Sequence, residues 1–486
     1  MLLREQLGRT SFTFVEPRHA GTNRGSLERT TKKLPGSQNC PLDRIDSVKS
    51  IFQNRHRVRE IGLCTQCFVF TRWTDKSVAA CITSLSNCYV ECQGIDERTG
   101  MSTLSGSTMT RTVAIIGTRG YPSFYGGFET LVRHLAPYLA DHGWNVVVYG
   151  REKALSTNPI DMDPRVRSVV TPGIDSKSAS TITYGATSSI HAVATKPDAA
   201  LVMNVANGFW LPLLRLRKIP TLVNVDGIEW EREKWGRIAK AIFAIGGRAT
   251  ARYATTLIYD SRALGIRWEE LSGRVGVFIP YGGDPRTGDD PPDGLARRKY
   301  ILMVARFVPE NTIGPFLDAI ETLCERWQVV IVGSSGYGGA LEERVADIAA
   351  RETNVRWYGH ISDDDMLFSL WENAGAYFHG HSVGGTNPAL VQAMACGAPV
   401  VARDTVYNRE VLGDGAVFVD PDPQCISAGL ETVLDDSELQ QELSTESIRR
   451  AHDHYTWERV CADYDRALRD HLSSADAVSA RNTALE

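Results

Sequence analysis

The sequence predicts an α/β protein made of two doubly wound domains, each built on a parallel sheet. Short runs of β-branched and aliphatic residues, such as Val113–Ile116 and Val329–Val332, end at a glycine. Segments with apolar residues at helical spacing, such as Phe128–Leu139, separate these runs. Buried strands that alternate with amphipathic helices are typical of parallel α/β units. A segment rich in Gly, Asp and Pro, Tyr281–Asp293, divides the runs into two series and indicates a linker between domains.

The first series begins directly after Met109, with Val113–Ile116. Gly143 is expected to end the helix that follows, and Pro137 inside this helix should kink it. Further strands of this series are expected at Val146–Tyr149, Ala200–Asn204, Thr221–Val225 and Leu257–Tyr259.

The second series contains two well-marked helical segments, Ile313–Arg326 and Pro388–Cys396, and a last helix over Trp457–His471 should pack back across both domains. The predicted domain limits are 1–108, 109–285, 286–455 and 456–486. Ligands are expected in the crevice at the carboxyl ends of the strands, where open parallel sheets bind them. The expected strands are Tyr300–Ala305, Val329–Val332, Val355–Tyr358, Ala376–Phe378 and Val400–Ala402.

Residues 1–108 differ in composition from the rest of the chain. They hold six of the ten cysteines and carry a charge of +5, against −10 for the other residues. They show no sustained helical or strand period. We expect a disordered extension, or translation from an upstream start codon, because a regular first strand begins just after Met109. A zinc site on Cys64 and Cys67 is the weaker alternative, since no second ligand pair has the usual spacing.

Composition limits the function classes. Hydrophobic residues make up 43% and charged residues 23% of the 486-residue chain, values typical of a globular protein with a large core. The net charge of −5 argues against nucleic-acid binding through overall basicity. No apolar run approaches the roughly 18 residues of a membrane span, and residues 1–20 lack the pattern of a secretory signal peptide. We therefore expect a cytoplasmic enzyme that binds no nucleic acid.

The first motif runs from Gly117 to Glu129, after the first expected strand. Gly126 and Gly127 open the next helix, where free backbone N–H groups and the helix dipole favour an anion. The spacing does not match the G-x-G-x-x-G pattern of dinucleotide-binding proteins. The glycines therefore indicate an anion site or, alternatively, a tight turn in which glycine serves only for packing.

Arg306 forms the second motif, because it follows directly after the strand Tyr300–Ala305. An arginine at the carboxyl end of a strand is well placed to bind a phosphate through two parallel hydrogen bonds. A surface ion pair with Glu310 is the alternative.

The third motif precedes the helix Pro388–Cys396. Asn387 or Thr386 is suited to cap this helix, and proline is favoured at the first helical position. Gly384 and Gly385 let a ligand approach the backbone closely. The motif predicts a second anion site, which together with the arginine of the second motif would hold a diphosphate without a metal. Asp-x-Asp strings also occur, but 58 acidic residues produce such strings by chance, so no metal site is predicted.

These segments together resemble family 4 retaining glycosyltransferases, and among them the rhamnosyltransferase-like subgroup. The resemblance covers residues 111–470 and rests on several ordered motifs. They are Ile-Gly-Thr-Arg-Gly-Tyr-Pro with Tyr-Gly-Gly-Phe-Glu, Asn-Val-Asp-Gly-Ile-Glu-Trp, Asp260-Ser261 and Gly-His-Ser-Val-Gly-Gly-Thr-Asn-Pro. The resemblance implies the GT-B fold, in which two Rossmann-like domains face a cleft. It also implies an acceptor on the first domain, a nucleotide sugar on the second, no metal cofactor and retention of the anomeric configuration.

The resemblance also implies roles for single residues. Arg306 would bind the donor diphosphate, and Asn311 stands where many members have a lysine. Gly359 and His360 would lie beside the base. The implied substrate-binding set is Gly126, Gly127, Asn311, Gly333, Gly359, His360, Gly384, Gly385, Thr386, Asn387 and Gln392.

Gly384 and Gln392 stand where the general family carries two glutamates eight residues apart. A carboxylate at position 392 would accept two hydrogen bonds from a ribose, whereas the amide offers one oxygen acceptor. We therefore expect Gln392→Glu to strengthen donor binding by up to about tenfold.

The implied reaction depends mainly on stabilising the departing nucleoside diphosphate. Arg306 and the helix N-terminus would stabilise that charge, and domain closure would exclude water and orient the acceptor. A departing phosphate oxygen would take the acceptor proton. Asp226 or Glu229 would position sugar hydroxyls or the acceptor, and an ion pair with Arg232 is the alternative for Glu229. The catalytic set is therefore Asp226, Glu229 and Arg306.

The segment Lys234–Arg252 combines basic residues with apolar ones such as Trp235 and Phe243. A basic helix of this kind indicates peripheral contact with an anionic membrane surface. A solvated helix face is the simpler alternative.

The predicted function is transfer of a hexosyl group, rhamnosyl in the named subgroup, from a nucleoside-diphosphate sugar to a hydroxyl of a glycan or lipid-linked acceptor. No cofactor is expected. A nucleotide-sugar isomerase of the 2-epimerase type is one alternative, but it needs a carboxylate cluster around the sugar, which the sequence does not reveal. A weakly active sugar-nucleotide-binding subunit is the other, suggested by Gln392.

Overall fold

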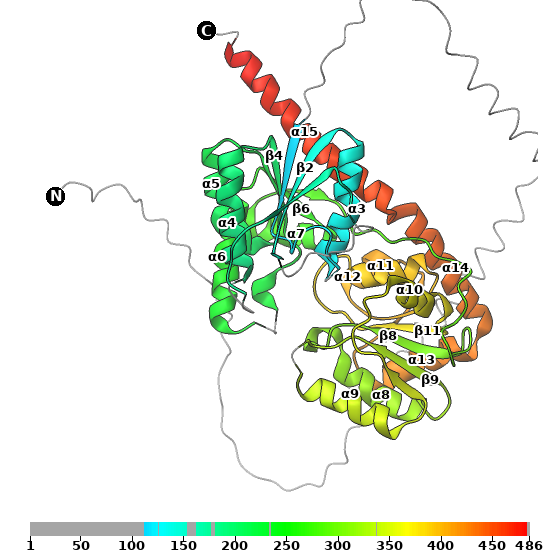
Figure 1. Cartoon of the computed structure of the whole chain (residues 1–486). Coiled ribbons are helices and arrows are strands. Elements are labelled where there is room, and N and C mark those ends of the chain that lie inside the picture. The colour runs from blue at the N-terminus through cyan, green and yellow to red at the C-terminus, as the bar shows by residue number, and fades with distance from the viewer. Residues whose placement is uncertain are drawn as a thin grey trace, which may run out of the picture. The chain divides into compact units, whose positions relative to one another are not determined.

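The computed structural model describes residues 111–124, 126–152, 162–175, 180–232, 235–336 and 338–483, with side chains up to residue 472 (Figure 1). These residues all belong to one compact unit of the chain, Cys40–Glu486. The predictions about residues 1–108, including the zinc alternative, fall outside the described residues.

The first sheet has seven parallel strands in the order β3-β2-β1-β4-β5-β6-β7. Val113 of β1 pairs with Val146 of β2 on one side and with Ala199 of β4 on the other. The strand order therefore reverses at β1, and ligands bind such sheets at the carboxyl ends of the strands beside this reversal. The strands are β1 Arg111–Ile116, β2 Trp144–Gly150, β3 Val166–Val170, β4 Ala199–Met203, β5 Thr221–Asn224, β6 Thr256–Tyr259 and β7 Val277–Phe278.

Helices connect these strands and cover the sheet (Figure 1). They form because one stripe of each is apolar, as Leu131, Leu135 and Leu139 show in α3. This helix continues through Pro137 to Asp141, since its buried stripe packs on both sides of the proline. The helices are α3 Gly127–Asp141, α4 Ser180–Thr195, α5 Leu211–Leu216, α6 Arg237–Tyr253 and α7 Arg262–Ser272, with short 3₁₀ turns at η3 Val205–Trp210 and η4 Glu229–Glu231.

The second sheet has six parallel strands in the order β10-β9-β8-β11-β12-β13, so its order reverses between β8 and β11. The strands are β8 Tyr300–Val304, β9 Gln328–Val332, β10 Val355–Trp357, β11 Ala376–His379, β12 Val400–Arg403 and β13 Ala416–Val419. The helices are α8 Ile313–Leu323, α9 Ala340–Arg351, α10 Asp364–Asn373, α11 Pro388–Ala395, α12 Val406–Leu412, α13 Pro423–Asp435 and α14 Ser437–His454, with the 3₁₀ turn η5 Pro309–Asn311. Two doubly wound parallel-sheet domains, as predicted, are therefore present.

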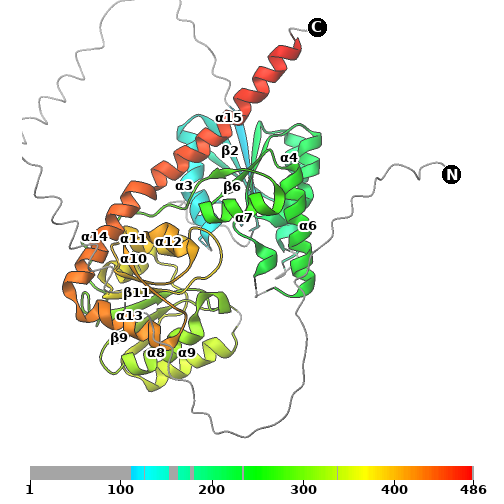
Figure 2. The same cartoon turned by 180° about the vertical axis from the view of Figure 1, so that it is seen from behind.

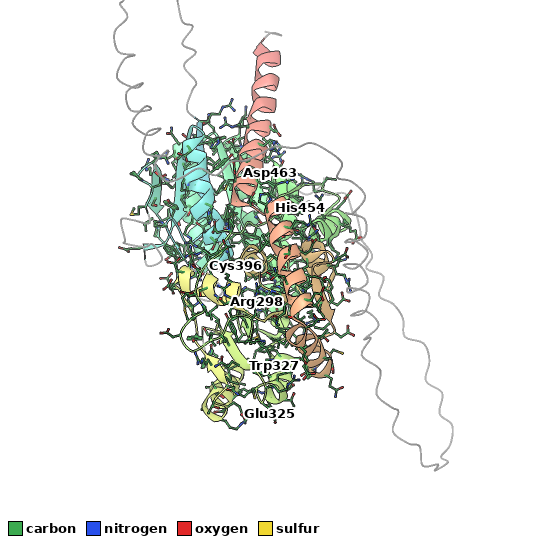
Figure 3. All side chains as sticks on the ribbon, turned by 90° about the vertical axis from the view of Figure 1, so that its right-hand side faces the viewer. Arg298, Glu325, Trp327, Cys396, His454 and Asp463 are labelled. Atoms are coloured by element: carbon green, nitrogen blue, oxygen red, sulfur yellow. The ribbon has the colours of Figure 1, made fainter. Side chains whose placement is uncertain are left out.

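The chain passes between the domains at two adjacent places. One is the predicted linker, and the other is the step from α14 to α15, Trp457–Thr483. The two connections pair where Gly283 donates its N–H to the carbonyl of Tyr455 at 2.8 Å. Arg298 fixes α14 to the second domain by donating to the carbonyl of Gly397 and the hydroxyl of Ser444 (Figure 3).

Helix α15 packs on the first domain, as Figure 2 shows from behind. Its buried side chains, Tyr464 and Leu468 among them, join the core cluster that contains β1 and α3. Trp457 stacks on His134 of α3 with ring centroids 4.2 Å apart. The sequence placed the start of α15 correctly but ended it at His471, whereas the helix continues to Thr483.

Three strands were not predicted: β3, β7 and β13. Strand β13 is an apolar run like the predicted strands, so its sequence does not explain the omission. Strand β3 carries Arg167 and Ser168, since it lies at the edge of the sheet and only Val166 is buried. Strand β7 has two residues and β13 has four, and both are also edge strands. Helix α8 ends at Leu323, three residues before the predicted end at Arg326.

Candidate functional site

The loops after β8, β9 and β10 meet at one edge of the second sheet. Gly333 follows β9 with a φ of +122° and donates its N–H to the carbonyl of Gly359, which follows β10. A Cβ atom at Gly333 would overlap the carbonyl of Ala305, so this position requires glycine. Arg306 is exposed just beyond this contact, and His360 is exposed next to Gly359. These four predicted residues therefore share the edge at which the sequence placed the nucleotide.

Asn311 stabilises the loop that carries Arg306. It is buried, and its side-chain amide donates to the backbone carbonyl of Arg306 at 2.8 Å. The carbonyl of the neighbouring Glu310 accepts hydrogen bonds from both the N–H and the hydroxyl of Ser382. Asn311 thus positions the arginine loop, and Ser382 ties that loop to the turn before α11.

Helix α11 starts as the third motif predicts. Asn387 caps it by accepting the N–H of Ala389 at 2.9 Å and that of Leu390, and Pro388 takes the first helical position. On the first domain, Gly126 precedes α3 and Gly127 begins it. A Cβ atom at Gly127 would lie 3.0 Å from the Cγ atom of Pro388. The N-termini of two helices from different domains therefore converge, which concentrates partial positive charge at one point.

Thr386 does not cap α11 but contacts the first domain. Its hydroxyl donates to the backbone carbonyl of Asp260, the residue after β6. The carboxyl group of Asp260 lies so close to Gly385 that any Cβ atom there would overlap it. Asp260 is 2% exposed, and its Oδ1 atom has no hydrogen-bond partner among the described residues. The glycine turn of the second domain, at Gly385, therefore packs directly against the buried carboxyl group of Asp260 in the first domain.

Arg232 of the first domain lies among charged groups from both domains. Its Nη1 atom forms an ion pair with Glu229 at 2.9 Å, and a Cβ atom at Gly384 would lie 3.3 Å from its Nη2 atom. Burial lowers the pKa of Arg232, but the charges of four carboxyl groups outweigh burial and raise it. The four groups are Glu229, Asp226, Glu310 and Asp260.

Two carboxyl groups of this cluster, Asp260 and Glu229, are deeply buried. Burial raises the pKa of Asp260 well above its usual value, and the nearby charge of Asp226 raises it further. The ionised form of Asp260 is therefore disfavoured. Glu229 is 3% exposed, and its second oxygen accepts the indole N–H of Trp235 at 2.7 Å. The ion-pair alternative for Glu229 is thus the arrangement observed.

Asp226 lies in a turn that the C-terminal helix supports. Asp226 has a φ of +57°, which a residue other than glycine rarely adopts. The side chain of Asn224 accepts the N–H of Asp226 at 3.1 Å and donates to the hydroxyl of Tyr464 in α15 at 2.8 Å. A residue some 240 positions away thus helps hold the turn next to the glycines of the second domain.

Gln392 forms two hydrogen bonds with the backbone of the linker. Its amide nitrogen donates to the carbonyl of Asp284 at 2.8 Å, and its amide oxygen accepts the N–H of the same residue at 3.0 Å. The nitrogen also lies 3.4 Å from the sulfur of Cys396, labelled in Figure 3. A glutamate could accept from Asp284 but not donate to it. The geometry therefore opposes our expectation that Gln392→Glu would strengthen donor binding.

The structure brings together residues from all three motifs and adds three that the sequence did not assign to the site. Arg232 appeared only as an ion-pair partner, and Asp260 only as part of a resemblance. Tyr281, which a Cβ atom at Gly127 would approach to 3.7 Å, was assigned only to the linker. The available signal for Asp260 was its place directly after a buried strand. Among the described residues, no cluster of His, Cys, Asp and Glu forms a candidate metal site.

Two family models match the chain along its two domains. Residues 290–450 match the glycosyl transferases group 1, and residues 110–284 match a domain of unknown function, DUF1972. Residues 290–450 are thus similar to the group 1 glycosyltransferases. Arg306 and the N-terminus of α11 lie within this matched segment, and the N-terminus of α3 lies within the segment that matches DUF1972.

Curated relatives and solved structures agree with this assignment. The chain is 33% identical to a phosphatidyl-myo-inositol mannosyltransferase of Mycolicibacterium smegmatis, over 42% of this chain and 54% of the relative. It is 25% identical to the O-antigen chain mannosyltransferase B of Escherichia coli, over 34% of this chain and 44% of the relative. The chain thus spans about half the length of the curated relatives it matches.

The fold is that of sucrose-phosphate synthase from Thermosynechococcus elongatus, with a TM-score of 0.63. The match covers 75% of this chain and 100% of that structure at 18% sequence identity, so it concerns the fold alone. The predicted GT-B fold is therefore confirmed. The relatives named here are mannosyltransferases, and the rhamnosyltransferase-like subgroup stays a prediction.

Proposed function

We propose that the chain is a retaining glycosyltransferase that moves a hexosyl group from a nucleoside-diphosphate sugar to a hydroxyl of a glycan or lipid-linked acceptor. The observation that carries this proposal is the meeting of the α3 and α11 N-termini at Gly127 and Pro388. A diphosphate bound there would have two helix dipoles and Arg306 to stabilise its charge as the bond to the sugar breaks.

The first-domain residues have separate tasks in this proposal. The carboxyl group of Asp260, whose ionised form burial disfavours, would hydrogen-bond a phosphate or sugar oxygen beside Gly385. Arg232 would compensate negative charge at Gly384, and Glu229 would hold the guanidinium in place as a positioning residue. Asp226 would orient a sugar hydroxyl. No general base is required, because a departing phosphate oxygen can accept the proton of the acceptor hydroxyl.

One observation bears on the isomerase alternative. The sequence revealed no carboxylate cluster, whereas the structure gathers four carboxyl groups around Arg232. Glu229 is already bound to Arg232 and Trp235, and the burial of Asp260 disfavours its ionised form. Neither is therefore suited to remove a proton from a sugar carbon. The cluster supports binding rather than isomerisation.

The experiment is turnover of a panel of nucleoside-diphosphate sugars, beginning with mannose, which the named relatives transfer, and rhamnose. Release of nucleoside diphosphate only in the presence of an acceptor supports the proposal. An altered sugar nucleotide without acceptor would favour the isomerase, and binding without turnover would favour the weakly active subunit. Proton NMR of the product reports the anomeric configuration, and turnover in a chelator tests metal independence.

A lipid-linked acceptor is consistent with one surface of the first domain. Leu216 of α5 and Ile238 of α6 are each 81% exposed, and the helices are neighbours. Neither helix contains an acidic residue, and exposed Arg237, Arg248 and Arg252 lie on α6. Exposed apolar side chains among basic ones favour an anionic bilayer surface. Lys234, at one end of the predicted segment, lies outside the described residues.

We propose that this surface rests peripherally on an anionic membrane. No described helix is both long and apolar enough to cross a bilayer. Sedimentation with vesicles containing anionic lipid, compared with purely zwitterionic vesicles, tests the contact. Ile238→Glu should weaken sedimentation with anionic vesicles, while Ile266→Glu, at an exposed site on α7, should not. Equal loss in both variants would contradict the proposed surface.

A further inference from the structure

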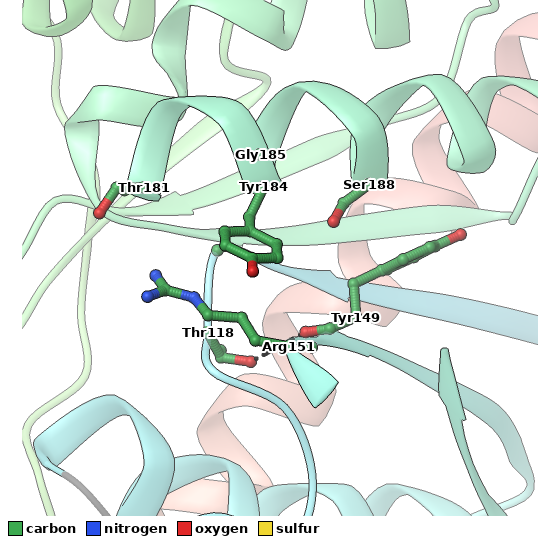
Figure 4. Close-up of a pocket in the computed structure, with 9 residues that line it drawn as sticks. Thr118, Tyr149, Arg151, Thr181, Tyr184, Gly185 and Ser188 are labelled. Atoms are coloured by element: carbon green, nitrogen blue, oxygen red, sulfur yellow. Dashed lines mark hydrogen bonds between the residues drawn. The ribbon is translucent and has the colours of Figure 1, made fainter. Parts of the chain in front are cut away.

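A small hollow that is open to solvent lies in the first domain, at the carboxyl ends of β1 and β2 and beside the first turns of α4 (Figure 4). Thr118, Tyr149 and Arg151 line it from the sheet, and Thr181, Tyr184 and Ser188 line it from the helix. The hollow therefore lies at the sheet edge where parallel α/β domains bind ligands. None of the roles proposed above uses these side chains.

Glycines fix the shape of this hollow. A Cβ atom at Gly150 would come within 2.5 Å of the Cα atom of Gly120. A Cβ atom at Gly185 would overlap the side chain of Asn207, which itself donates to the carbonyl of Met203 at 2.7 Å. The backbone segments around the hollow therefore approach closely at these glycines, where no side chain separates them. The hollow lies beside these close contacts.

Most polar groups of the hollow already have partners. The hydroxyl of Thr118 donates to the carbonyl of Tyr149, and the hydroxyl of Tyr184 donates to Asp175 at 2.9 Å. Arg151 differs from them, because its Nε atom is buried and makes no hydrogen bond among the described residues. Its guanidinium group lies 4.8 Å from the centre of the Tyr184 ring, which holds it in place.

Figure 4 shows the guanidinium group of Arg151 below the Tyr184 ring, on the side of the hollow where Thr181 lies. Thr181 is in the first turn of α4, where backbone N–H groups have no partner within the helix. A planar guanidinium group and a helix N-terminus on the same hollow are a combination that binds phosphate in proteins.

The charges around Arg151 are compatible with an anion. Burial lowers the pKa of Arg151, and the positive charge of Arg119 lowers it further. Three groups act in the opposite direction: Tyr184, Glu129 and Asp175. Asp175 already accepts the hydroxyl of Tyr184, and burial raises the pKa of Glu129. The guanidinium group of Arg151 is thus accompanied by one engaged carboxylate and one carboxyl group whose ionised form is disfavoured.

Glu129 lies between the hollow and the converging N-termini of α3 and α11. Its Oε1 atom accepts the N–H of Arg119 at 3.0 Å. Its Oε2 atom lies 3.4 Å from where a Cβ atom of Gly126 would be. The same side chain therefore contacts the loop that borders the hollow and the glycine turn that faces α11. A ligand in the hollow would be next to the donor, on the acceptor side.

We propose that this hollow binds a phosphate ester carried by the acceptor, with Arg151 as its principal ligand. This inference rests on the proposed function, because it assigns a chemical class to the acceptor of that reaction. The donor diphosphate does not compete for the hollow, since its ligands lie at the glycine turn and the loops of the second domain.

The test uses the full chain and three small probes: glycerol phosphate, neutral glycerol and glucuronate. Binding is followed by isothermal titration and, for the phosphate, by broadening of its phosphorus NMR signal. Arg151→Gln should weaken glycerol phosphate binding by about tenfold or more, because a charge-assisted hydrogen bond is lost. Arg167→Gln, at an exposed arginine on β3 of the same domain, should leave it unchanged within about twofold. Arg151→Lys keeps the charge without the planar fork and should fall between these values.

Three results would overturn the inference: no binding of glycerol phosphate, equal binding of glycerol, or tighter binding of glucuronate. Unchanged affinity in Arg151→Gln would also overturn it. Nucleoside diphosphate affinity is measured in each variant and should not change, which shows that the fold is intact. If the sugar-nucleotide panel gives no turnover while Arg151 still governs phosphate binding, the proposed function fails and the hollow remains a phosphate site. If turnover is found and Arg151→Gln leaves it unchanged, only the inference fails.

Discussion

The two domains contribute to the site in different ways. The second domain presents backbone: glycines at 333, 359, 384 and 385 and the N-terminus of α11. The first domain presents buried and half-buried charged side chains: Asp226, Glu229, Arg232 and Asp260. Backbone donors have a fixed geometry, whereas a group of side chains depends on mutual charge compensation. The second domain should therefore be sensitive to small changes of shape, and the first to changes of charge.

The largest effect is expected from Gly385→Ala, which tests the shape of the second domain. The new Cβ atom would overlap the carboxyl group of Asp260, which is buried and cannot move aside. We expect sugar transfer to fall by about a hundredfold or more, because displacement by about 1 Å has that effect on a positioned site. Gly314→Ala is the control, since no atom lies within 4 Å of its Cβ position.

A double variant separates this contact from general damage. Asp260→Ala removes the carboxyl group and should restore part of the activity of Gly385→Ala. Full activity in Gly385→Ala alone would show that the domains do not meet in this arrangement during transfer.

Arg232→Met tests the charge compensation of the first domain. It leaves the four surrounding carboxyl groups without their cation, and breaking a buried ion pair costs about 3–5 kcal/mol. We expect the urea midpoint of the first domain to fall accordingly, while Arg248→Met, at an exposed arginine, changes it little. Adding Glu229→Gln should recover part of the loss. An unchanged midpoint in Arg232→Met would show that the cluster is not held by its arginine.

Arg306→Ala tests the exposed arginine that the second domain contributes. Arg306 is exposed, so stability should not change. Donor binding should weaken by about 1.5–3 kcal/mol, or about tenfold to more than a hundredfold, through loss of a charge-assisted contact. Titration with nucleoside diphosphate measures this, with Arg326→Ala on the same domain as control. Equal affinities would place Arg306 outside the donor site.

Gln392→Glu should have the smallest effect, and it tests the linker rather than the nucleotide. The carboxylate cannot donate to the carbonyl of Asp284, so one hydrogen bond is lost and about 1 kcal/mol of stability with it. Donor affinity should stay within about twofold. Chemical unfolding and calorimetry measure the two quantities, and Gln441→Glu on the exposed face of α14 is the control. A clear gain in donor affinity would instead support the ribose contact implied by the family resemblance.

Most of the backbone features of the second domain, its glycine turn and the start of α11, were predictable from the sequence. Glycine and proline act locally, so Gly384, Gly385 and Pro388 mark a turn and a helix start wherever the chain folds. The strands of both sheets were found for the same reason, since a buried parallel strand is a short apolar run. Strand β3 was not recognised because it lies at the edge of its sheet, where exposed positions carry polar residues.

The side-chain half of the site was not predictable in this way. Asn311 and Gln392 were assigned to the ligand because of their positions in motifs, and the sequence did not reveal that both bond to the backbone of neighbouring loops. Their contact with a ligand stays a prediction. Arg151 and the hollow were missed because their partners come from β1, β2 and α4, with no shared local pattern.

The sequence by itself therefore determined the two parallel sheets, the linker, the helix starts and the resemblance of the second domain to glycosyltransferases. Each of these depends on residues close together in the chain, whose spacing fixes local structure. The tertiary structure alone decided that Asp260 is buried beside Gly385, that Arg232 is surrounded by carboxyl groups, and that Tyr464 supports the Asp226 turn. Burial and charge act through space, so these properties exist only once distant segments have been brought together.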